Sequence, residues 1–153
     1  MQSNRFFLLV WIGLQTVLLV PDVAQAACRL SSAAIAFGNY DPLIATALDT
    51  AGSVVYRCAP QDRNITITLS RGGGTSFATR RMVNGTDRLF YNLYRDAART
   101  TIWGDGTNGT QSYFIGNPAN NQDISVAIFG RIPASQNVKV GAYTDTITVT
   151  LSF

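Results

Sequence analysis

YTDTITVTLSF, from Tyr143 to Phe153, closes the chain and decides the class of fold. Ile147, Val149, Leu151 and Phe153 lie at every second position, and hydroxyl residues lie between them. Successive side chains of a β-strand point to opposite faces, whereas a helix repeats about every 3.6 residues. This stretch therefore predicts a half-buried β-strand and excludes a helix.

Four earlier stretches carry the same kind of signal, combining β-branched or aromatic residues with short alternation. Turn dipeptides and prolines lie between them and interrupt regular structure. Short strands separated by turns, with no internal repeat and no second domain, predict an all-β sandwich of two sheets. The expected strands are Gly52–Cys58, Asn64–Leu69, Arg88–Tyr94, Asp123–Phe129 and Tyr143–Phe153.

Charge is sparse along the chain. Twelve Lys and Arg residues stand against nine acidic ones, which gives a net charge of +3. Lys139 is the only lysine, every acidic residue is Asp, and the arginines are scattered. Nucleic-acid binding needs clustered positive charge, so this composition predicts no nucleic-acid partner. A chain without Glu, with one Lys and with many Thr, Ser and Asn also disfavours helices.

Residues 1–26 have the three parts of a secretory signal peptide. A polar start with Arg5 precedes the apolar run Phe6–Val20, and Ala24 and Ala26 offer small residues for cleavage before Ala27. The run has roughly 15 residues, short of the roughly 20 that span a membrane. We predict residues 1–26 as a signal peptide and 27–153 as an exported domain, located at the cell surface or in the medium.

Cys28 and Cys58 are the only cysteines. An even number of cysteines in an exported chain predicts a disulfide bond. Closing a loop of about 30 residues would stabilise the fold by roughly 3–4 kcal/mol if the bond limits the unfolded chain. The alternative is a pair of free buried thiols.

No set of residues favours catalysis. The chain has no histidine, which excludes Ser-His-Asp and Cys-His mechanisms and histidine metal sites. Asp96 and Asp105 flank Trp103, an arrangement that a glycosidase would use, but both stand beside turn residues, where Asp accepts backbone hydrogen bonds. Lys139 lies in a polar stretch. We expect no enzyme activity, no cofactor or metal ligand and no small-molecule substrate.

Exposed aromatic residues in loops would favour another function, that of a surface-binding adhesin module. Trp103, Tyr113 and Phe114 are the candidates. Large aromatic side chains more often fill a core, and we favour the core for these three.

Several short motifs, taken in their order, are similar to those of the spore coat protein U domain family, which is shared with pilins of the archaic chaperone–usher systems. The resemblance covers nearly all of residues 27–153. The motifs are Cys28, Phe37–Pro42 (FGNYDP), Cys58, Gly72–Gly74, Arg81-Met82, Leu89–Asp96 (LFYNLYRD), Ile102–Thr107 (IWGDGT), Phe129–Ile132 (FGRI) and Gly141–Asp145 (GAYTD).

This resemblance implies an incomplete immunoglobulin-like sandwich that lacks its last strand and has a hydrophobic groove in its place. A periplasmic chaperone would fill the groove first. A strand from another pilin subunit would replace it at the outer-membrane usher, by β-strand addition. The accepting edge would be Ile147, Val149, Leu151 and Phe153. The chain would be a structural subunit of a surface fibre (fimbrium) active in adhesion and biofilm formation; a spore-coat or envelope structural protein is the alternative.

The start of the exported domain departs from the family pattern. Fibre subunits of this kind carry a donor strand before the first cysteine, whereas cleavage before Ala27 leaves one residue before Cys28. A subunit that accepts a strand and donates none is expected at the tip of a fibre.

Overall fold

The computed structural model describes residues 28–153, so the predicted signal peptide lies outside the described residues. Within this range, no helix is long and apolar enough to cross a membrane. The elements in chain order are β1 (Arg29–Ala34), β2 (Leu48–Arg57), β3 (Ile65–Leu69), the 3-10 turn η1 (Phe77–Thr79), β4 (Arg81–Asn84), β5 (Asp87–Phe90), β6 (Asn92–Tyr94), β7 (Tyr113–Ile115), β8 (Asp123–Ile132) and β9 (Val149–Ser152).

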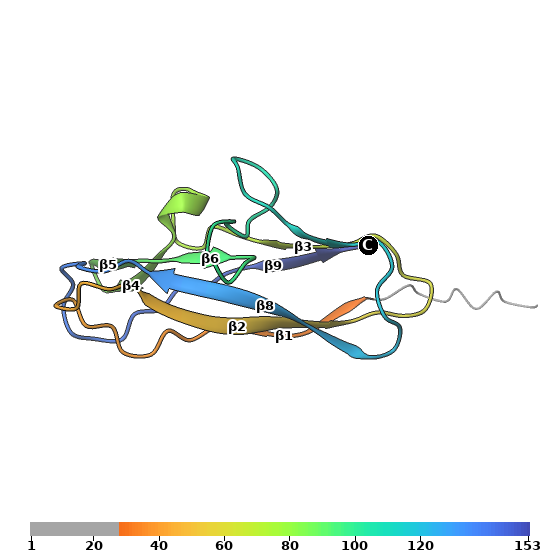
Figure 1. Cartoon of the computed structure of the whole chain (residues 1–153), viewed down its shortest axis with the longest axis horizontal. Coiled ribbons are helices and arrows are strands. Elements are labelled where there is room, and N and C mark those ends of the chain that lie inside the picture. Colours follow the sequence, from red (N-terminus) through yellow and green to blue (C-terminus); the bar gives the residue numbers. More distant parts are fainter. Residues whose placement is uncertain (1–27) are drawn as a thin grey trace, which may run out of the picture.

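The strands form two facing layers (Figure 1). One sheet has the order β1-β2-β8-β6 and the other the order β7-β3-β9, while β4 and β5 form a two-stranded hairpin. The pairings between these strands are antiparallel. This arrangement confirms the predicted all-β, incomplete immunoglobulin-like sandwich.

The core lies between the two sheets and is filled by alternate residues of their strands. In β3, Ile65, Ile67 and Leu69 are at most 1% exposed, and the threonines between them are half-buried. Full burial of aliphatic side chains of this size stabilises the fold by about 1.5–3 kcal/mol each. The predicted alternation of this strand is confirmed.

Cys28 and Cys58 form a disulfide bond, as predicted, across a sequence separation of 30 residues. The bond joins the residue before β1 to the residue after β2, and these two strands pair along their length. Because β1 is an edge strand, the disulfide fastens one end of that edge to the sheet.

The prediction of a single strand over Arg88–Tyr94 is wrong. The structure divides it into β5 and β6, with Tyr91 between them. β5 pairs with β4 and β6 pairs with β8, so the chain changes partner at Tyr91, whose N–H donates to the Arg80 carbonyl. A run of β-formers shows that the backbone is extended but not which strand it joins.

The predicted strand Tyr143–Phe153 keeps its alternation of burial from residue 143 to 152. Its regular ladder with β3 is shorter and covers Val149–Ser152. Upstream, Thr144 pairs with Val83 of β4. The strand therefore passes from one neighbour to another along its length.

Strand β1 carries no periodic sequence signal. Its six residues, RLSSAA, are all exposed. A strand with no buried face needs no alternation of apolar residues, which explains why its sequence does not predict it.

Candidate functional site

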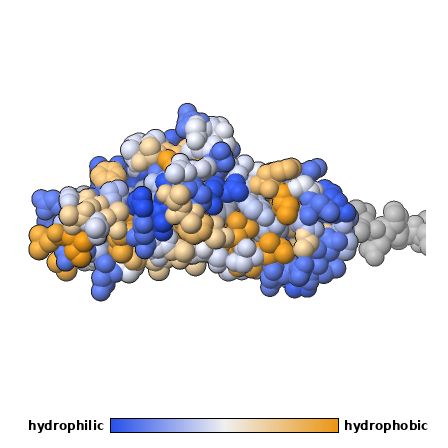
Figure 2. All heavy atoms as spheres, viewed as in Figure 1, coloured by the Kyte–Doolittle hydropathy of each residue, from blue (hydrophilic) through white to orange (hydrophobic). Residues whose placement is uncertain are grey.

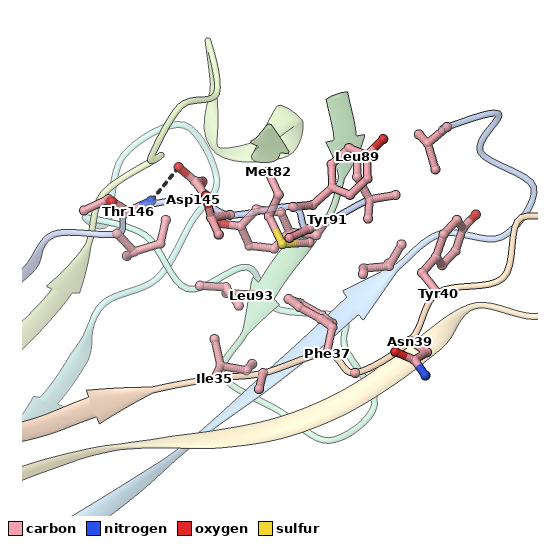
Figure 3. Close-up of a pocket in the computed structure, with 18 of the residues that line it drawn as sticks. Ile35, Phe37, Asn39, Tyr40, Met82, Leu89, Tyr91, Leu93, Asp145 and Thr146 are labelled. Atoms are coloured by element: carbon pink, nitrogen blue, oxygen red, sulfur yellow. Dashed lines mark hydrogen bonds between the residues drawn. The ribbon is translucent and has the colours of Figure 1, made fainter. Parts of the chain in front are cut away.

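A groove of about 940 Å³ runs between the two sheets (Figure 3). One wall is the chain from Ala33 to Tyr40, at the end of β1 and beyond it, and the other is Lys139–Ile147 with Val149. Its floor is built from core side chains of both sheets. The floor residues are Leu69, Met82, Leu89, Tyr91, Leu93, Ile128 and Ile132.

The wall formed by β1 has an unpaired edge. Among the described residues, β1 pairs only with β2 and stands at the end of its sheet. All of its side chains are exposed, including Leu30 at 40%. One face of each strand in a sandwich normally packs on the opposite sheet, but the side chains of β1 stay exposed although the strand approaches β9.

The opposite wall has an unpaired edge as well. The N–H of Ser70 donates to the carbonyl of Thr148, which makes these two residues a hydrogen-bonded pair continuing the β3–β9 register. Residues of an antiparallel strand alternate between facing one neighbour and facing the other. Thr148 and Thr150 therefore direct their backbone groups toward β3, and Ile147, Val149 and Leu151 direct theirs toward the open edge.

Hydrogen bonds on the far side of β3 agree with this assignment. The Leu69 N–H donates to the Gly104 carbonyl, and the Ile67 carbonyl accepts the Trp103 indole N–H. The odd-numbered residues of β3 thus face away from β9, and the even-numbered ones face it. The open edge of β9 combines free backbone groups with inward apolar side chains on the same residues.

The four residues predicted for the accepting edge lie at different depths. Ile147 and Val149 line the groove. Leu151 packs on the core without lining the groove, and Phe153 is 56% exposed. The structure therefore places two of the four in the groove; their role in accepting a strand stays a prediction.

Phe37 and Ile35 fill part of the groove from the β1 side, and Figure 3 shows both pointing into it. The Phe37 ring meets Tyr91 edge-on at 5.5 Å between centroids. A Cβ added at Gly130 would lie 2.7 Å from the Phe37 ring and 2.8 Å from Ile35. Gly130 in β8 thus leaves the space that these two side chains occupy.

One carboxylate stands in this apolar setting. Asp145 accepts hydrogen bonds from the Tyr91 hydroxyl (2.7 Å), the Gly73 N–H (2.9 Å) and the Thr146 N–H (2.8 Å). Burial, reinforced by the hydrogen bond to Asp145, raises the pKa of Tyr91 well above its ordinary value. These bonds fix the groove wall at Asp145 to the floor and to the glycine loop after β3.

Arg80 lies beneath this wall and is fully buried. Its guanidinium donates to the Ser70 carbonyl (3.1 and 2.8 Å), the Asn92 side-chain oxygen (2.9 Å) and the Trp103 carbonyl (2.7 Å). Burial lowers the pKa of Arg80 to about 10. The sequence marks it only as half of the adjacent basic pair Arg80-Arg81, because its partners come from three separate segments.

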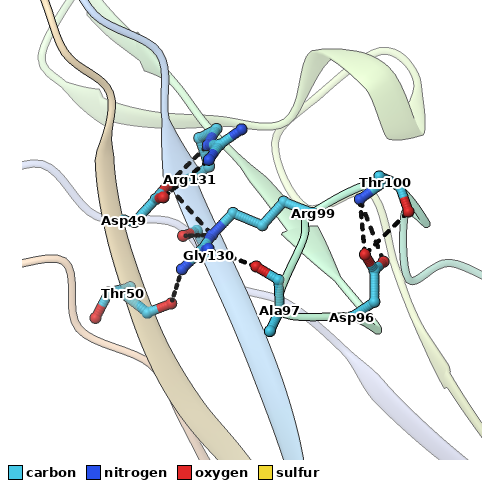
Figure 4. Close-up of polar contacts among 8 residues, drawn as sticks. All are labelled: Asp49, Thr50, Asp96, Ala97, Arg99, Thr100, Gly130 and Arg131. Carbon is cyan, nitrogen blue, oxygen red and sulfur yellow. Dashed lines mark hydrogen bonds and ion pairs between the residues drawn. The ribbon is translucent and has the colours of Figure 1, made fainter.

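The aspartates weighed as catalytic residues accept turn hydrogen bonds. Asp96 accepts from the N–H and hydroxyl of Thr100 (Figure 4). It also accepts from the Thr101 N–H. These bonds, led by the Thr100 N–H, lower the pKa of Asp96 to about 2. Asp105 accepts from the N–H and hydroxyl of Thr107, and these bonds lower its pKa. Each carboxylate holds its own loop.

Other candidate chemical groups are also accounted for. The Lys139 side chain is 81% exposed, with its Nζ 3.8 Å from an Asp87 oxygen. In the described range, Cys28, Cys58 and Asp62 form the group closest to a metal-ligand cluster. Both of its sulfurs are joined in the disulfide.

The aromatic residues proposed for surface binding divide between core and surface. The core position favoured for Trp103 is confirmed, because Trp103 is 0% exposed. Tyr113 is half-buried and packs against Tyr56 and Trp103. The core position favoured for Phe114 is wrong, because this residue is 59% exposed on β7.

Apolar residues also gather at one end of the molecule. Figure 2 shows hydrophobic surface at the end that carries β4 and β5. Leu43 is 92% exposed, Ile44 51% and Val140 fully exposed. They belong to the loop after β1 and the loop after β8, which also supply the two walls of the groove.

The fold and this open groove define a structural β-sandwich protein, and sequence comparison identifies its family. The Spore Coat Protein U domain matches residues 14–150. Protein U of Myxococcus xanthus is 35% identical over 144 residues, which cover 83% of this chain and 78% of Protein U. The chain belongs to the Spore Coat Protein U domain family. This family is structural and not enzymatic, which confirms the prediction that the chain is not an enzyme.

The solved structures include a protein of the same fold. It is found in the CsuC–CsuE chaperone–tip adhesion subunit pre-assembly complex of the archaic chaperone–usher Csu pili of Acinetobacter baumannii. The TM-score is 0.59 at 20% sequence identity, over 84% of this chain. This chain spans 40% of the solved chain that it matches. The likeness confirms the sandwich fold.

Proposed function

We propose that this protein is an exported structural subunit of a surface fibre assembled by the chaperone–usher route, and that its groove accepts a β-strand from another protein. The observation that carries the proposal is one apolar groove between two walls that continue the edge strands β1 and β9, each of which has a single strand partner among residues 28–153. A single added strand would hydrogen-bond to both edges and bury its alternate side chains in the groove.

Three kinds of partner follow from this proposal. A periplasmic chaperone would supply the first strand and protect an apolar edge that otherwise invites aggregation. An outer-membrane usher would be the site where that strand is exchanged. A second pilin subunit would supply the final strand. The matched solved complex, which pairs a chaperone with a tip adhesion subunit, supports this route.

A second candidate is a structural protein of a spore coat or cell envelope. The family description and the similarity to Protein U support it. The groove would also serve there, because strand addition is able to join neighbouring subunits of a layer as well as of a fibre. The candidates differ in the assembled object: a fibre that needs a chaperone and usher, or a coat layer that does not.

We propose further that the subunit occupies the tip of its fibre. Cleavage before Ala27 would leave no segment long enough to act as a donor strand before Cys28. A subunit that accepts and does not donate completes no other subunit, so the tip is the position that suits it.

The direct test of strand acceptance is binding of a synthetic peptide of about ten residues that alternates valine and threonine, the length of an extended strand along one wall. Ile147→Asp and Val149→Asp should abolish binding, because each puts a charge into the apolar groove. Thr150→Asp is the matched control, since Thr150 lies on the exposed face of the same strand. Fluorescence anisotropy of a labelled peptide measures the affinity.

A peptide of the same composition, with its valines in one block, controls for general hydrophobic adsorption. Equal binding of the block and alternating peptides, or Thr150→Asp as damaging as Val149→Asp, would contradict strand acceptance. Circular dichroism of each variant, together with an assay for free thiols, shows whether the sandwich and its disulfide are retained.

A further inference from the structure

We propose that Arg80 is the positioning residue of the groove. Its guanidinium donates hydrogen bonds to the Ser70 carbonyl oxygen and so ends the β3–β9 ladder at Ser70. The chain before Thr148, which forms the second groove wall, is then held against β4. This inference rests on the proposed strand-accepting function, which it deepens by naming the residue that shapes the accepting edge.

The Ser70–Thr148 pair is incomplete in a specific way. In a hydrogen-bonded antiparallel pair, each residue donates to the carbonyl of the other. Ser70 donates to the Thr148 carbonyl at 2.9 Å. The Thr148 N–H, however, donates to the Ser70 hydroxyl at 2.9 Å, while the Ser70 carbonyl accepts two hydrogen bonds from Arg80.

The chain before Thr148 is therefore free to take another partner. Thr144 forms two backbone hydrogen bonds with Val83 of β4, at 2.9 and 3.2 Å. Asp145 is then fixed by Tyr91 and by Gly73 of the glycine loop. Thr144, Asp145 and Ile147 line the groove. The position of this wall is therefore set by the residue at which the chain stops pairing with β3.

Arg80 is able to fix that point because it is anchored in both sheets. Its remaining donors reach Asn92 of β6 and the Trp103 carbonyl, and its guanidinium lies over the Phe77 ring at 5.4 Å. A planar guanidinium satisfies several carbonyls at fixed angles, whereas a lysine ammonium has three donors on a flexible stem. The Arg80→Lys substitution therefore keeps the positive charge but removes the planar set of hydrogen-bond donors.

The test compares Arg80→Lys with Arg81→Lys in the full-length exported protein. Arg81 is the next residue, and no side-chain hydrogen bond or ion pair of Arg81 occurs among residues 28–153. Amide hydrogen exchange is followed by NMR. We expect Arg80→Lys to speed exchange at Thr144 and Val83 by roughly tenfold or more, the effect of losing a charged hydrogen bond. Exchange at Val54, in the β2–β8 ladder, should stay unchanged.

Binding of the alternating Val/Thr peptide is the second readout. It should weaken roughly tenfold in Arg80→Lys and stay within about twofold in Arg81→Lys. Unchanged exchange at Thr144 and Val83 in a folded Arg80→Lys protein would overturn the proposal. If the wild type binds no peptide, strand acceptance fails, yet the exchange measurement still decides whether Arg80 positions the wall.

A measurement on the wild type covers the case in which Arg80→Lys does not fold. NMR couplings across hydrogen bonds should connect the Arg80 side-chain nitrogens to the Ser70 carbonyl carbon. They should be absent between the Thr148 amide nitrogen and that same carbon. A Thr148–Ser70 coupling would show a complete ladder pair, and Arg80 would then not end the ladder.

Discussion

At the scale of single residues, buried or bridging polar groups hold the loops that frame the sandwich. Arg99 donates to the Gly130 and Ala97 carbonyls and lies 3.2 Å from Asp49, which also binds Arg131 (Figure 4). The loop from Asp96 onward is thereby fastened to the outer face of β2 and β8. The Asp96 carboxylate closes this loop on itself.

The Asp96 loop predicts an acid-sensitive contribution to stability. Hydrogen bonds, led by the one from the Thr100 N–H, lower the pKa of the Asp96 carboxyl group from 3.8 to about 2. The folded state therefore binds fewer protons than the unfolded state between these values, so the contribution is present above pH 3.8 and lost as pH falls toward 2. Urea unfolding from pH 5 to pH 2 should show a smaller loss for Asp96→Asn than for wild type. Identical profiles would contradict this role.

At the scale of elements, β1 and β2 set where the first groove wall begins. β2 pairs with β8 over all ten of its residues, but with β1 only from Ser53 to Arg57. The β1–β2 ladder stops just before Gly52, where the chain after β1 passes close to the β2 backbone. A side chain at Gly52 would overlap the Ala34 carbonyl oxygen and lie 2.9 Å from the Ile35 Cα. This glycine permits the close crossing that directs Ile35 and Phe37 into the groove.

Gly52→Ala should destabilise the protein by roughly 1–3 kcal/mol, the usual cost of forcing extra volume into a packed site. The clash is with backbone, which has no alternative rotamer. Gly116→Ala is the control, because its nearest neighbours would lie at 3.9 and 4.0 Å, an ordinary contact. Urea unfolding of both variants measures the difference. Equal stability of Gly52→Ala and wild type would contradict this prediction, because it would show that the backbone crossing accommodates an added methyl group.

At the scale of the whole molecule, the sandwich has two sheets and an unfilled position between their edges. A strand bound in the groove, as proposed above, would stabilise the protein, because a ligand that binds only the folded state raises the free energy of unfolding. The same open edges favour aggregation when uncovered. Both effects make the proposed subunit dependent on a strand from outside itself.

The proposed tip position gives the whole-molecule prediction. N-terminal sequencing of the exported protein should begin at Ala27 or within about two residues of it, where the cleavage signal lies. Immunogold labelling of fibres should then mark their ends. Labels spaced along the shaft would contradict the tip position, because every shaft subunit must donate a strand. A mature chain starting well before Ala27 would remove the reason for it.

The sequence by itself determined the features that depend on local periodicity and composition. Alternation over Asn64–Leu69 and from Ile147 to Leu151 specifies strands with one inner face, since side-chain direction repeats every two residues. The cysteine pair indicated the disulfide, and the turn settings of Asp96 and Asp105 indicated their structural role. Motif order indicated the family.

Only the tertiary structure decided which strands are neighbours and where an edge stays open. The sequence did not predict β1, because its residues are exposed and need no alternation of apolar side chains. The division of Arg88–Tyr94 and the shift of the last strand from β3 to β4 depend on partners far away in the chain. Arg80 draws its acceptors from residues 70, 92 and 103. Periodicity records which way a side chain points, whereas pairing depends on distant backbone groups that must meet in space.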